Sequence, residues 1–478
     1  MTRRGSSLRV PPLRVPLIQE HGPSILVASL SSTFGVTLLL ATKALTVLIY
    51  GDESTGGSVI VAIILGFIAF VFVAIAIYVG AVVTSNTFAT IVAGRTRTIA
   101  LMRLIGSSAA DQRKAVAREG LAVGVVGAVL GLGIGIGANA VLLGVALATK
   151  FVPSLAFSYI DPTVALPVVS VVLTTWLASW IGSRRVLIVT PVQATGAAEE
   201  HRFETAAGHG KRNAVAITLF AIGTAILLAG VAIGQIDPRG LLVGVLGGLL
   251  SFTGVVLGAQ LIMPPTLRLV GRLLGTSASS RLAAQNAMRY PERSSRTTIG
   301  LVIGVTLVTM FSVAVQTVLV IIDAARKAAP EVYAGTDQIL TIVAVIFSVV
   351  GGFSAVIAAV GMVNNLSLSV LQRTRELGLL RALGFTAKQV KSMIVAESVQ
   401  LTVAAVVVGL VLGTFYGWAG AESMLGEIQG GPGLVFPAVP LVLVAVIIVA
   451  AAVLTWLASA TPARRATRVA PVVALAVE

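Results

Sequence analysis

The chain contains no cysteine, few charged residues and few histidines. Of its 478 residues, only 11% are Asp, Glu, Lys or Arg, and three are His. The absence of cysteine excludes disulfide bonds and thiolate chemistry. The shortage of charge excludes a large soluble globular protein, because such domains carry about 25% charged residues. The three histidines have no carboxylate partners at ligand spacing, so no metal site is expected.

Hydrophobic residues make up 56% of the sequence and are grouped in long runs. One of these, "SVIVAIILGFIAFVFVAIAIYVGAVV", exceeds the roughly 20 residues that a helix needs to cross a bilayer. The sequence therefore predicts an all-α polytopic membrane protein with about ten transmembrane helices. The predicted spans cover residues 25–50, 58–84, 117–148, 163–183, 213–234, 240–270, 297–322, 338–364, 396–420 and 437–460.

Lysine and arginine are concentrated in alternate connections between these runs, and the net charge is +15. By the positive-inside rule, this distribution predicts a multi-pass protein of the plasma membrane with both termini in the cytoplasm. Such loops also favour membrane lipids with anionic headgroups as partners. No basic patch is interleaved with aromatic residues, so nucleic acid is not an expected partner. The basic connections are Arg95–Arg118, Arg184–Arg212, Arg268–Arg296, Arg373–Lys391 and the C-terminal tail.

The two halves of the chain resemble each other. "GVTL" occurs at Gly35 and Gly304, and "TWLAS" occurs at Thr175 and Thr455. Parallel repeats of this kind occur in transporters, so each half is predicted to be a four-helix repeat in the same orientation. At one constant spacing, Asn86, Arg95, Thr96, Arg97, Leu101, Arg103, Gly106 and Glu119 match Asn364, Arg373, Thr374, Arg375, Leu379, Arg381, Gly384 and Glu397.

The fifth and sixth spans have no counterpart and are predicted to be a two-helix insert between the repeats. The connections on either side of the insert are expected in the cytoplasm. The predicted organisation is a cytoplasmic arm (1–24), a first repeat (25–195), a linker (196–212), the two-span insert (213–274), a linker with an amphipathic helix (275–296), and a second repeat with a cytoplasmic tail (297–478).

A charged segment follows the second span of each repeat. We call these segments the first elbow, residues 95–112 ("RTRTIALMRLIGSSAADQ"), and the second elbow, residues 373–390 ("RTRELGLLRALGFTAKQV"). Each has the amphipathic pattern of a helix at a membrane interface. The helix ends at Gly106 or Gly384, since glycine takes the left-handed conformation at little cost.

A second helix starts directly after each of these glycines. Ser108 with Asp111, and Thr386 with Gln389, have the spacing of an N-cap residue and its reciprocal partner. Each elbow is therefore expected to be a rigid, capped helical bend beneath the membrane. Two interpretations remain open: an interfacial helix that only anchors two spans, or a docking surface for a cytoplasmic protein.

The second elbow resembles the signature of FtsX-like and MacB-like ABC transporter permeases, a motif of the type R-x-x-E-[IL]-G-x-x-[RK]-A-[LIM]-G. The similarity extends over both repeats. It implies a permease subunit whose elbows are coupling helices for a cytoplasmic ABC ATPase, expected in two copies. The motif positions are occupied by Arg373, Glu376, Gly378, Arg381, Ala382 and Gly384.

No G-x-x-x-x-G-K-[ST] phosphate-binding loop occurs in the chain, so we expect no enzyme activity and no bound cofactor. ATP and Mg would be bound by the partner ATPase. In the first elbow, Thr98 and Ala100 replace the Glu and Gly of the motif, so the two docking sites are expected to be unequal. The expected ATPase-docking residues are Arg95, Arg97, Arg103, Gly106, Arg373, Arg375, Glu376, Gly378, Arg381 and Gly384.

Three ionisable residues outside the motif are further candidates. Glu119 and Glu397 begin the third span of their repeats, where they either pair with elbow arginines or bind substrate. Lys43 lies inside the first span. Charges within spans are functional candidates, so Lys43 either contacts substrate or a lipid headgroup, or reaches the interface with its long side chain.

The expected function is that of a permease that couples ATP hydrolysis on a separate subunit to movement of a lipid, lipoprotein or amphipathic peptide or drug, in the export direction. Many relatives carry a large extracytoplasmic domain, whereas the corresponding connections here, "GDESTGG" and 323–338, are short. The alternative is a membrane scaffold or signalling component that recruits the ATPase to regulate a sensor or wall enzyme without transport. A secondary transporter would need paired ionisable residues at the membrane midplane, and Lys43 is the only clear ionisable residue well inside a predicted span.

Overall fold

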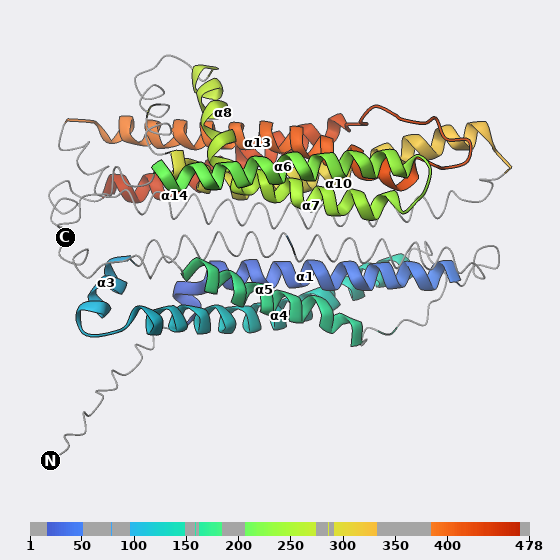
Figure 1. The fold of residues 1–478 in the computed structure, drawn as a ribbon. Helices are drawn as coiled ribbons and strands as arrows, with labels where there is room; N and C mark the ends of the chain where they lie inside the picture. Colours follow the sequence, from blue (N-terminus) through green and yellow to red (C-terminus); the bar gives the residue numbers. More distant parts are fainter. Residues whose placement is uncertain are drawn as a thin grey trace.

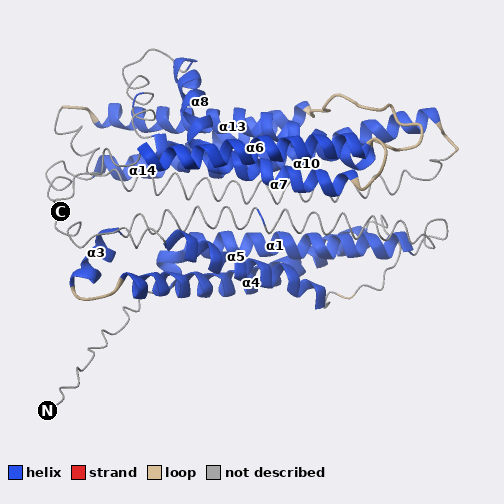
Figure 2. Ribbon diagram, in the orientation of Figure 1, coloured by secondary structure: helices blue, strands red, loops and turns tan. Residues whose placement is uncertain are grey.

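In the computed structural model, regular structure in the described residues is entirely helical (Figure 2). Seven of these helices are long and apolar enough to cross a membrane. The predicted all-α multi-pass membrane fold is therefore confirmed. The second and eighth predicted spans, 58–84 and 338–364, lie outside the described residues except for Tyr78. The structure describes residues 17–50, 78, 96–148, 158, 162–183, 206–273, 285, 291–331 and 384–468.

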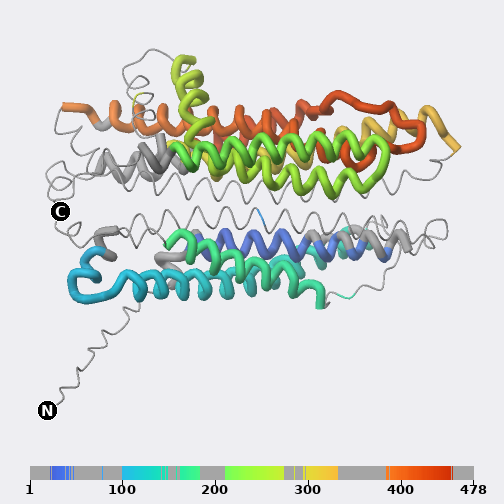
Figure 3. Tube along the Cα trace, in the orientation of Figure 1, coloured from blue at the N-terminus to red at the C-terminus, as the bar shows by residue number. Residues whose placement is uncertain are grey.

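The described helices form two packed groups, drawn as two layers in Figures 1 and 3. In the first group, α4 packs along both α1 and α5, and the short helix α3 lies at one end. This group comprises α1 (Leu17–Tyr50), α3 (Thr96–Leu104), α4 (Ala109–Ala148), the 3-10 turn η1 (Pro162–Val164) and α5 (Ala165–Gly182).

In the second group, α13 packs along α10 and α14 in the way that α4 packs along α1 and α5. Helices α6 and α7 form a hairpin against α13. The order and packing of these triplets match between the groups. The second group comprises α6 (Ala206–Gly234), α7 (Gly240–Leu257), α8 (Ala259–Leu273), α10 (Pro291–Ala328), α13 (Ala387–Leu425) and α14 (Leu441–Arg468).

The seam between α1 and α4 is built from small and hydroxyl-bearing residues. Ser32 Oγ donates to the carbonyl oxygen of Ala128 at 3.0 Å, and Thr33 Oγ1 donates to that of Gly131 at 3.2 Å. Near the other end, Asn139 Nδ2 donates to the carbonyl oxygen of Thr37 at 2.7 Å. Small residues let helix backbones approach closely in a membrane, and polar side chains then link the helices.

The glycine-rich run of α4 divides between the two faces of the helix. Gly131 and Gly135 are buried against α1, whereas a Cβ at Gly133 or Gly137 would meet no atom within 4 Å. The four glycines therefore do not form one close-packing face, although the sequence pattern of the run suggests one. The physical reason is the helical period, which places residues four apart on the same face and residues two apart on different faces.

The seam between α10 and α13 repeats this arrangement. Gly409 faces Val305 and Thr306, as Gly131 faces Ser32 and Thr33. In this pairing Thr33 is equivalent to Thr306. The repeated letters "GVTL" instead align Thr37 with Thr306, so the packed register differs by about one helical turn from the match in sequence.

The predicted sixth span, 240–270, is two helices, and this expectation was wrong. Helix α7 ends at Leu257, and α8 begins at Ala259 after a break at Gly258. Helix α8 buries one stripe, which includes Met263 and Leu267, against α10 and α13, while its two arginines face outward. Adjacent prolines and two arginines make α8 a poor spanning helix, so it turns away from α7 and projects from the second group past α13 (Figure 1).

Several helices begin before the apolar runs from which the spans were predicted. Helix α1 starts at Leu17, α6 at Ala206 and α10 at Pro291, within the predicted arm and the two predicted linkers. Their first turns carry polar and charged residues, because a helix can extend beyond the hydrocarbon layer into the aqueous phase.

Candidate functional site

The first elbow is a helix stop followed at once by a helix start. Gly106 has a φ of 103°, a conformation that favours glycine over residues with a Cβ. The Ser107 N–H donates to the carbonyl oxygen of Met102 at 3.0 Å, and the Gly106 N–H donates to that of Arg103 at 3.2 Å. These bonds close the C-terminus of α3 as in a Schellman turn.

Helix α4 then begins with a capped turn. The Asp111 N–H donates to Ser108 Oγ at 3.1 Å, and Ser108 Oγ donates to Asp111 Oδ2 at 2.6 Å. Gln112 Nε2 also donates to Ser107 Oγ at 2.8 Å. The bend between α3 and α4 is thereby held by local hydrogen bonds on both sides.

The second elbow contains the same turn. Gly384 has a φ of 98°, and Thr386 caps α13 in a complete capping box. The Gln389 N–H donates to Thr386 Oγ1 at 3.2 Å, and the Thr386 N–H donates to Gln389 Oε1 at 2.9 Å. The other docking candidates of this elbow, Arg373, Arg375, Glu376, Gly378 and Arg381, lie outside the described residues.

Helix α3 and the turn that follows it present large apolar side chains on their surface. Leu101, Leu104 and Ile105 are 48%, 52% and 69% exposed, whereas Ala100 is fully buried. Arg103 is half-buried in the last turn of α3 and is engaged in an interaction. The Arg97 side chain and all of Arg95 lie outside the described part. Exposed apolar groups of this size favour burial against a partner or in the membrane interface.

The helices behind the elbows are anchored to their neighbours. The guanidinium carbon of Arg113 on α4 lies 3.9 Å from the ring centroid of Trp180 on α5, a cation–π contact. On the other side, Gln400 Nε2 on α13 donates to the carbonyl oxygen of Leu267 on α8 at 2.8 Å. A force applied at either elbow therefore acts on packed helices.

The remaining predicted residues occupy separate places. Glu397 is buried and Glu119 half-buried near the starts of α13 and α4, and each is engaged in an interaction. Lys43 is half-buried on α1 and is also engaged in an interaction. The alternative roles of these three residues stay predictions.

Glu422 was missed in the sequence. It is fully buried near the C-terminus of α13, where its Oε2 accepts from Gln235 Nε2 at 2.9 Å and its Oε1 accepts from the Val435 N–H at 2.8 Å. The apolar run predicted a span ending at residue 420, which placed Glu422 in an outer loop, but α13 continues to Leu425. The sequence did contain a signal that the helix continues past residue 420, namely the helical spacing of Tyr416, Ala419 and Ser423.

Glu422 joins three segments that are distant in sequence. Gln235 belongs to the turn between α6 and α7, and Val435 belongs to the connection between α13 and α14. Beside it, Gly234 and Gly244 bring the backbone of the α6–α7 hairpin close to Ser423. A carboxylate in the last turn of a helix opposes the helix dipole, so these two hydrogen bonds offset an unfavourable position.

The elbows coincide with the segments that the chain shares with known proteins. The family described as FtsX-like permease C-terminal matches residues 70–191 and 348–471, together slightly more than half of the chain. These two matches contain α3, α4 and α5 in one case and the described parts of α13 and α14 in the other. The α6–α7 hairpin and α8 lie between them.

Two curated proteins of Bacillus subtilis (strain 168) are also similar. The uncharacterized ABC transporter permease YknZ is 32% identical over 105 residues, which is 22% of this chain and 25% of YknZ. The ABC transporter permease YtrF is 26% identical over 128 residues, or 25% of this chain and 29% of YtrF. The matched segments thus span only about a quarter of each relative. Since the family match occurs twice and covers half of the sequence, this multi-pass membrane protein belongs to the FtsX-like family of ABC transporter permeases.

Proposed function

We propose that this chain is the membrane subunit of an ABC transporter and that one copy of a separate ATPase docks on each elbow. Nucleotide-driven closure of the ATPase pair would pull the two elbows together. The movement would be passed along α4 and α13 to the opposite end of the bundle. The observation that carries the proposal is the pair of capped bends, one at the start of each long helix.

The charge of the described helices supports a cytoplasmic position for both elbows. Ten basic residues lie on α3 and α8 and near the starts of α4, α6 and α13, at one end of the bundle (Figure 1). Basic residues at one end of a membrane bundle favour the cytoplasm. These residues are Arg103, Arg113, Lys114, Arg118, Lys211, Arg212, Arg268, Arg272, Lys388 and Lys391.

The cargo that suits the described helices is apolar in part. Their exposed side chains are largely aliphatic, including Val129, Ile134, Leu246 and Val411. A polar solute would need a route lined with hydrogen-bonding groups. We therefore propose a lipid, lipoprotein or amphipathic peptide as the cargo, moved outward.

The docking surface is tested at both elbows. We expect Leu104→Asp with Ile105→Asp to weaken co-purification of the cognate ATPase about tenfold or more, because two charges replace an apolar contact worth about 1.4 kcal/mol or more. We expect the same from Glu376→Ala with Arg381→Ala. The measurement is the ATPase-to-permease ratio after affinity purification, together with ATP turnover.

Ile236→Asp is the matched control, because Ile236 is an equally exposed apolar residue at the opposite end of the bundle. It should leave the ratio and the turnover unchanged. If both elbow double variants retain the ATPase at full yield with normal turnover, the docking assignment is wrong.

Subunit number gives an independent test. Because one chain carries both elbows, we expect native mass spectrometry of the purified complex to show one permease with two ATPase subunits. A complex with two permease chains would contradict the assignment of one ATPase to each elbow. A correct complex whose ATP hydrolysis moves no amphiphile between vesicle leaflets would instead favour the scaffold function.

A further inference from the structure

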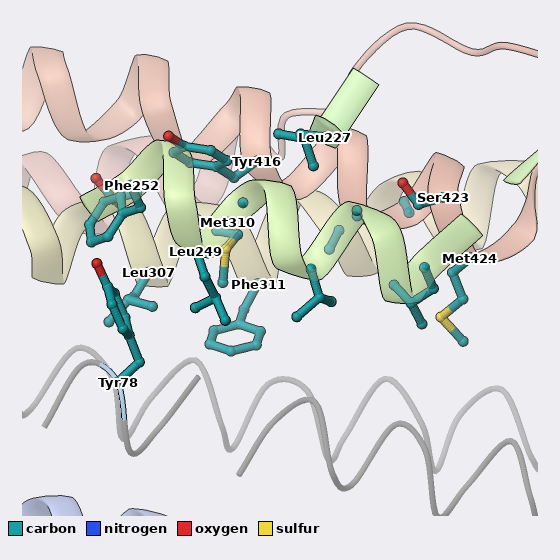
Figure 4. Close-up of a pocket in the computed structure, with 18 of the residues that line it drawn as sticks. Tyr78, Leu227, Leu249, Phe252, Leu307, Met310, Phe311, Tyr416, Ser423 and Met424 are labelled. Carbon is teal, nitrogen blue, oxygen red and sulfur yellow. The ribbon is translucent and has the colours of Figure 1, made fainter. Parts of the chain in front are cut away.

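A cavity lies between the α6–α7 hairpin and the second repeat. It has a volume of about 170 Å³ and is bounded by α7, α10 and α13, with Tyr78 on a fourth side (Figure 4). The lining includes Leu249, Phe311 and Met424. A pocket whose lining is almost entirely apolar suits a hydrocarbon group.

The polar groups in its wall are turned to other partners. The Tyr78 hydroxyl is 2.8 Å from Thr253 Oγ1, and the Tyr416 hydroxyl is 2.8 Å from Ser251 Oγ. The two tyrosines therefore offer their rings to the space while their hydroxyls are paired. Thr306 is the exception, because its buried hydroxyl has no hydrogen-bond partner among the described residues.

The cavity is elongated along the helices. On α7 its lining runs from Leu241 to Phe252, which corresponds to about 17 Å at 1.5 Å per residue. Phe252 and Met424 lie at opposite ends of it in Figure 4. A length of about 17 Å is close to half of the roughly 30 Å hydrocarbon thickness of a bilayer, the depth of one leaflet.

We propose that this cavity binds one alkyl chain of a lipid-like amphiphile, between the insert and the second repeat. The apolar lining excludes a polar ligand, because burying an unpaired polar group there would cost several kcal/mol. Its length and the aliphatic residues toward Met424 fit an extended chain. That the amphiphile is cargo depends on the function proposed above, whereas binding of the chain does not.

The test uses the purified full-length chain in phospholipid nanodiscs, without the ATPase. The probe is a single-chain phosphocholine that carries a photoreactive diazirine in the middle of its alkyl chain. After illumination, we expect mass spectrometry to find adducts on the segments of α7, α10 and α13 that line the cavity. Adducts spread evenly over the exposed faces of α4 and α5 would overturn the proposal.

Two glycines allow the cavity to be filled without a clash. At Gly248 and Gly420, both in the lining, an added Cβ would meet no atom within 4 Å. We expect Gly248→Leu and Gly420→Leu each to reduce the adducts in the cavity at least about tenfold. Gly133→Leu, at an equally open glycine of α4, should leave them unchanged. Undiminished labelling in both filled variants would overturn the proposal.

A further variant separates an alkyl chain from a polar ligand. Thr306→Val keeps the shape of the wall and removes its unpaired hydroxyl, so we expect undiminished labelling. A loss comparable to that in Gly248→Leu would contradict an alkyl occupant. Competition then identifies the source: labelling that falls as the ratio of diacyl phospholipid to probe in the nanodisc is raised indicates a bilayer lipid, whereas displacement only by an unlabelled single-chain amphiphile indicates a cargo molecule.

The two proposals can fail separately. Elbow variants that lose the ATPase but keep the adducts leave the alkyl site intact. A complex that forms and turns over normally, but gives no adducts in the cavity, overturns the alkyl site and leaves the transporter assignment standing.

Discussion

Replacing Gly131 by leucine is expected to prevent the first group of helices from assembling. A Cβ at this position would lie 2.5 Å from Ser32 Cβ and 2.8 Å from the backbone nitrogen of Thr33, and it would also overlap the carbonyl oxygen of Ser29. Backbone atoms cannot turn away as a side chain can, so α4 would have to separate from α1. Overpacking of this kind costs about 3 kcal/mol, which is about a hundredfold in the folding equilibrium.

Gly133→Leu is the matched control, because it places the same side chain two residues away on the open face of α4. This variant should fold as well as the parent chain or better, since leucine is preferred over glycine in a helix by up to about 1 kcal/mol. The measurements are the yield of monodisperse protein in detergent and its thermal unfolding midpoint. Equal behaviour of the two variants would show that α1 and α4 do not meet at this seam.

Glu422→Ala is expected to release the α6–α7 hairpin from the end of α13. The change removes the acceptor for Gln235 Nε2 and for the Val435 N–H, and it leaves a gap in a fully buried position. Each buried donor without a partner costs about 1–3 kcal/mol. The thermal midpoint should fall, and amide hydrogen exchange should rise in the turn at 235–239 and the connection at 426–440.

Two variants separate this effect from a simple loss of charge. Glu422→Gln keeps the shape and one acceptor oxygen, so it should lose less stability than Glu422→Ala. Glu427→Ala removes an exposed carboxylate five residues further on and should change neither stability nor exchange. If Glu422→Ala behaves as Glu427→Ala does, the buried carboxylate does not hold the three segments together.

Several of the features described above lie on one helix, α13. At one end it carries the capping box of Thr386 and Gln389, in its middle the seam glycines Gly409 and Gly413, and near its other end Glu422. A helix of 39 residues is about 58 Å long at 1.5 Å per residue, which exceeds the thickness of a bilayer. Under the proposed function, movement of the second elbow would thus reach the wall of the alkyl-chain cavity directly.

The sequence by itself determined the features that depend on neighbouring residues. Apolar runs predicted where helices lie, because a long uncharged helix is stable only where lipid replaces water. The stops at Gly106 and Gly384, and the starts at Ser108 and Thr386, were predicted from two or three adjacent positions. Helix stops and caps are local hydrogen-bond arrangements, so they can be predicted from the sequence without knowledge of a partner helix.

Only the tertiary structure decided which residues meet. Gly131 and Gly133 look equivalent in the sequence, yet one lies in a seam and the other on an open face because of the rotation of α4 about its axis. Glu422 and its hydrogen-bond donor Gln235 are more than a hundred residues apart in the sequence. The cavity likewise brings together residues of α7 and α13 that are more than a hundred residues apart. Helix rotation and depth are set by the summed packing of all neighbours, which no single stretch of sequence contains.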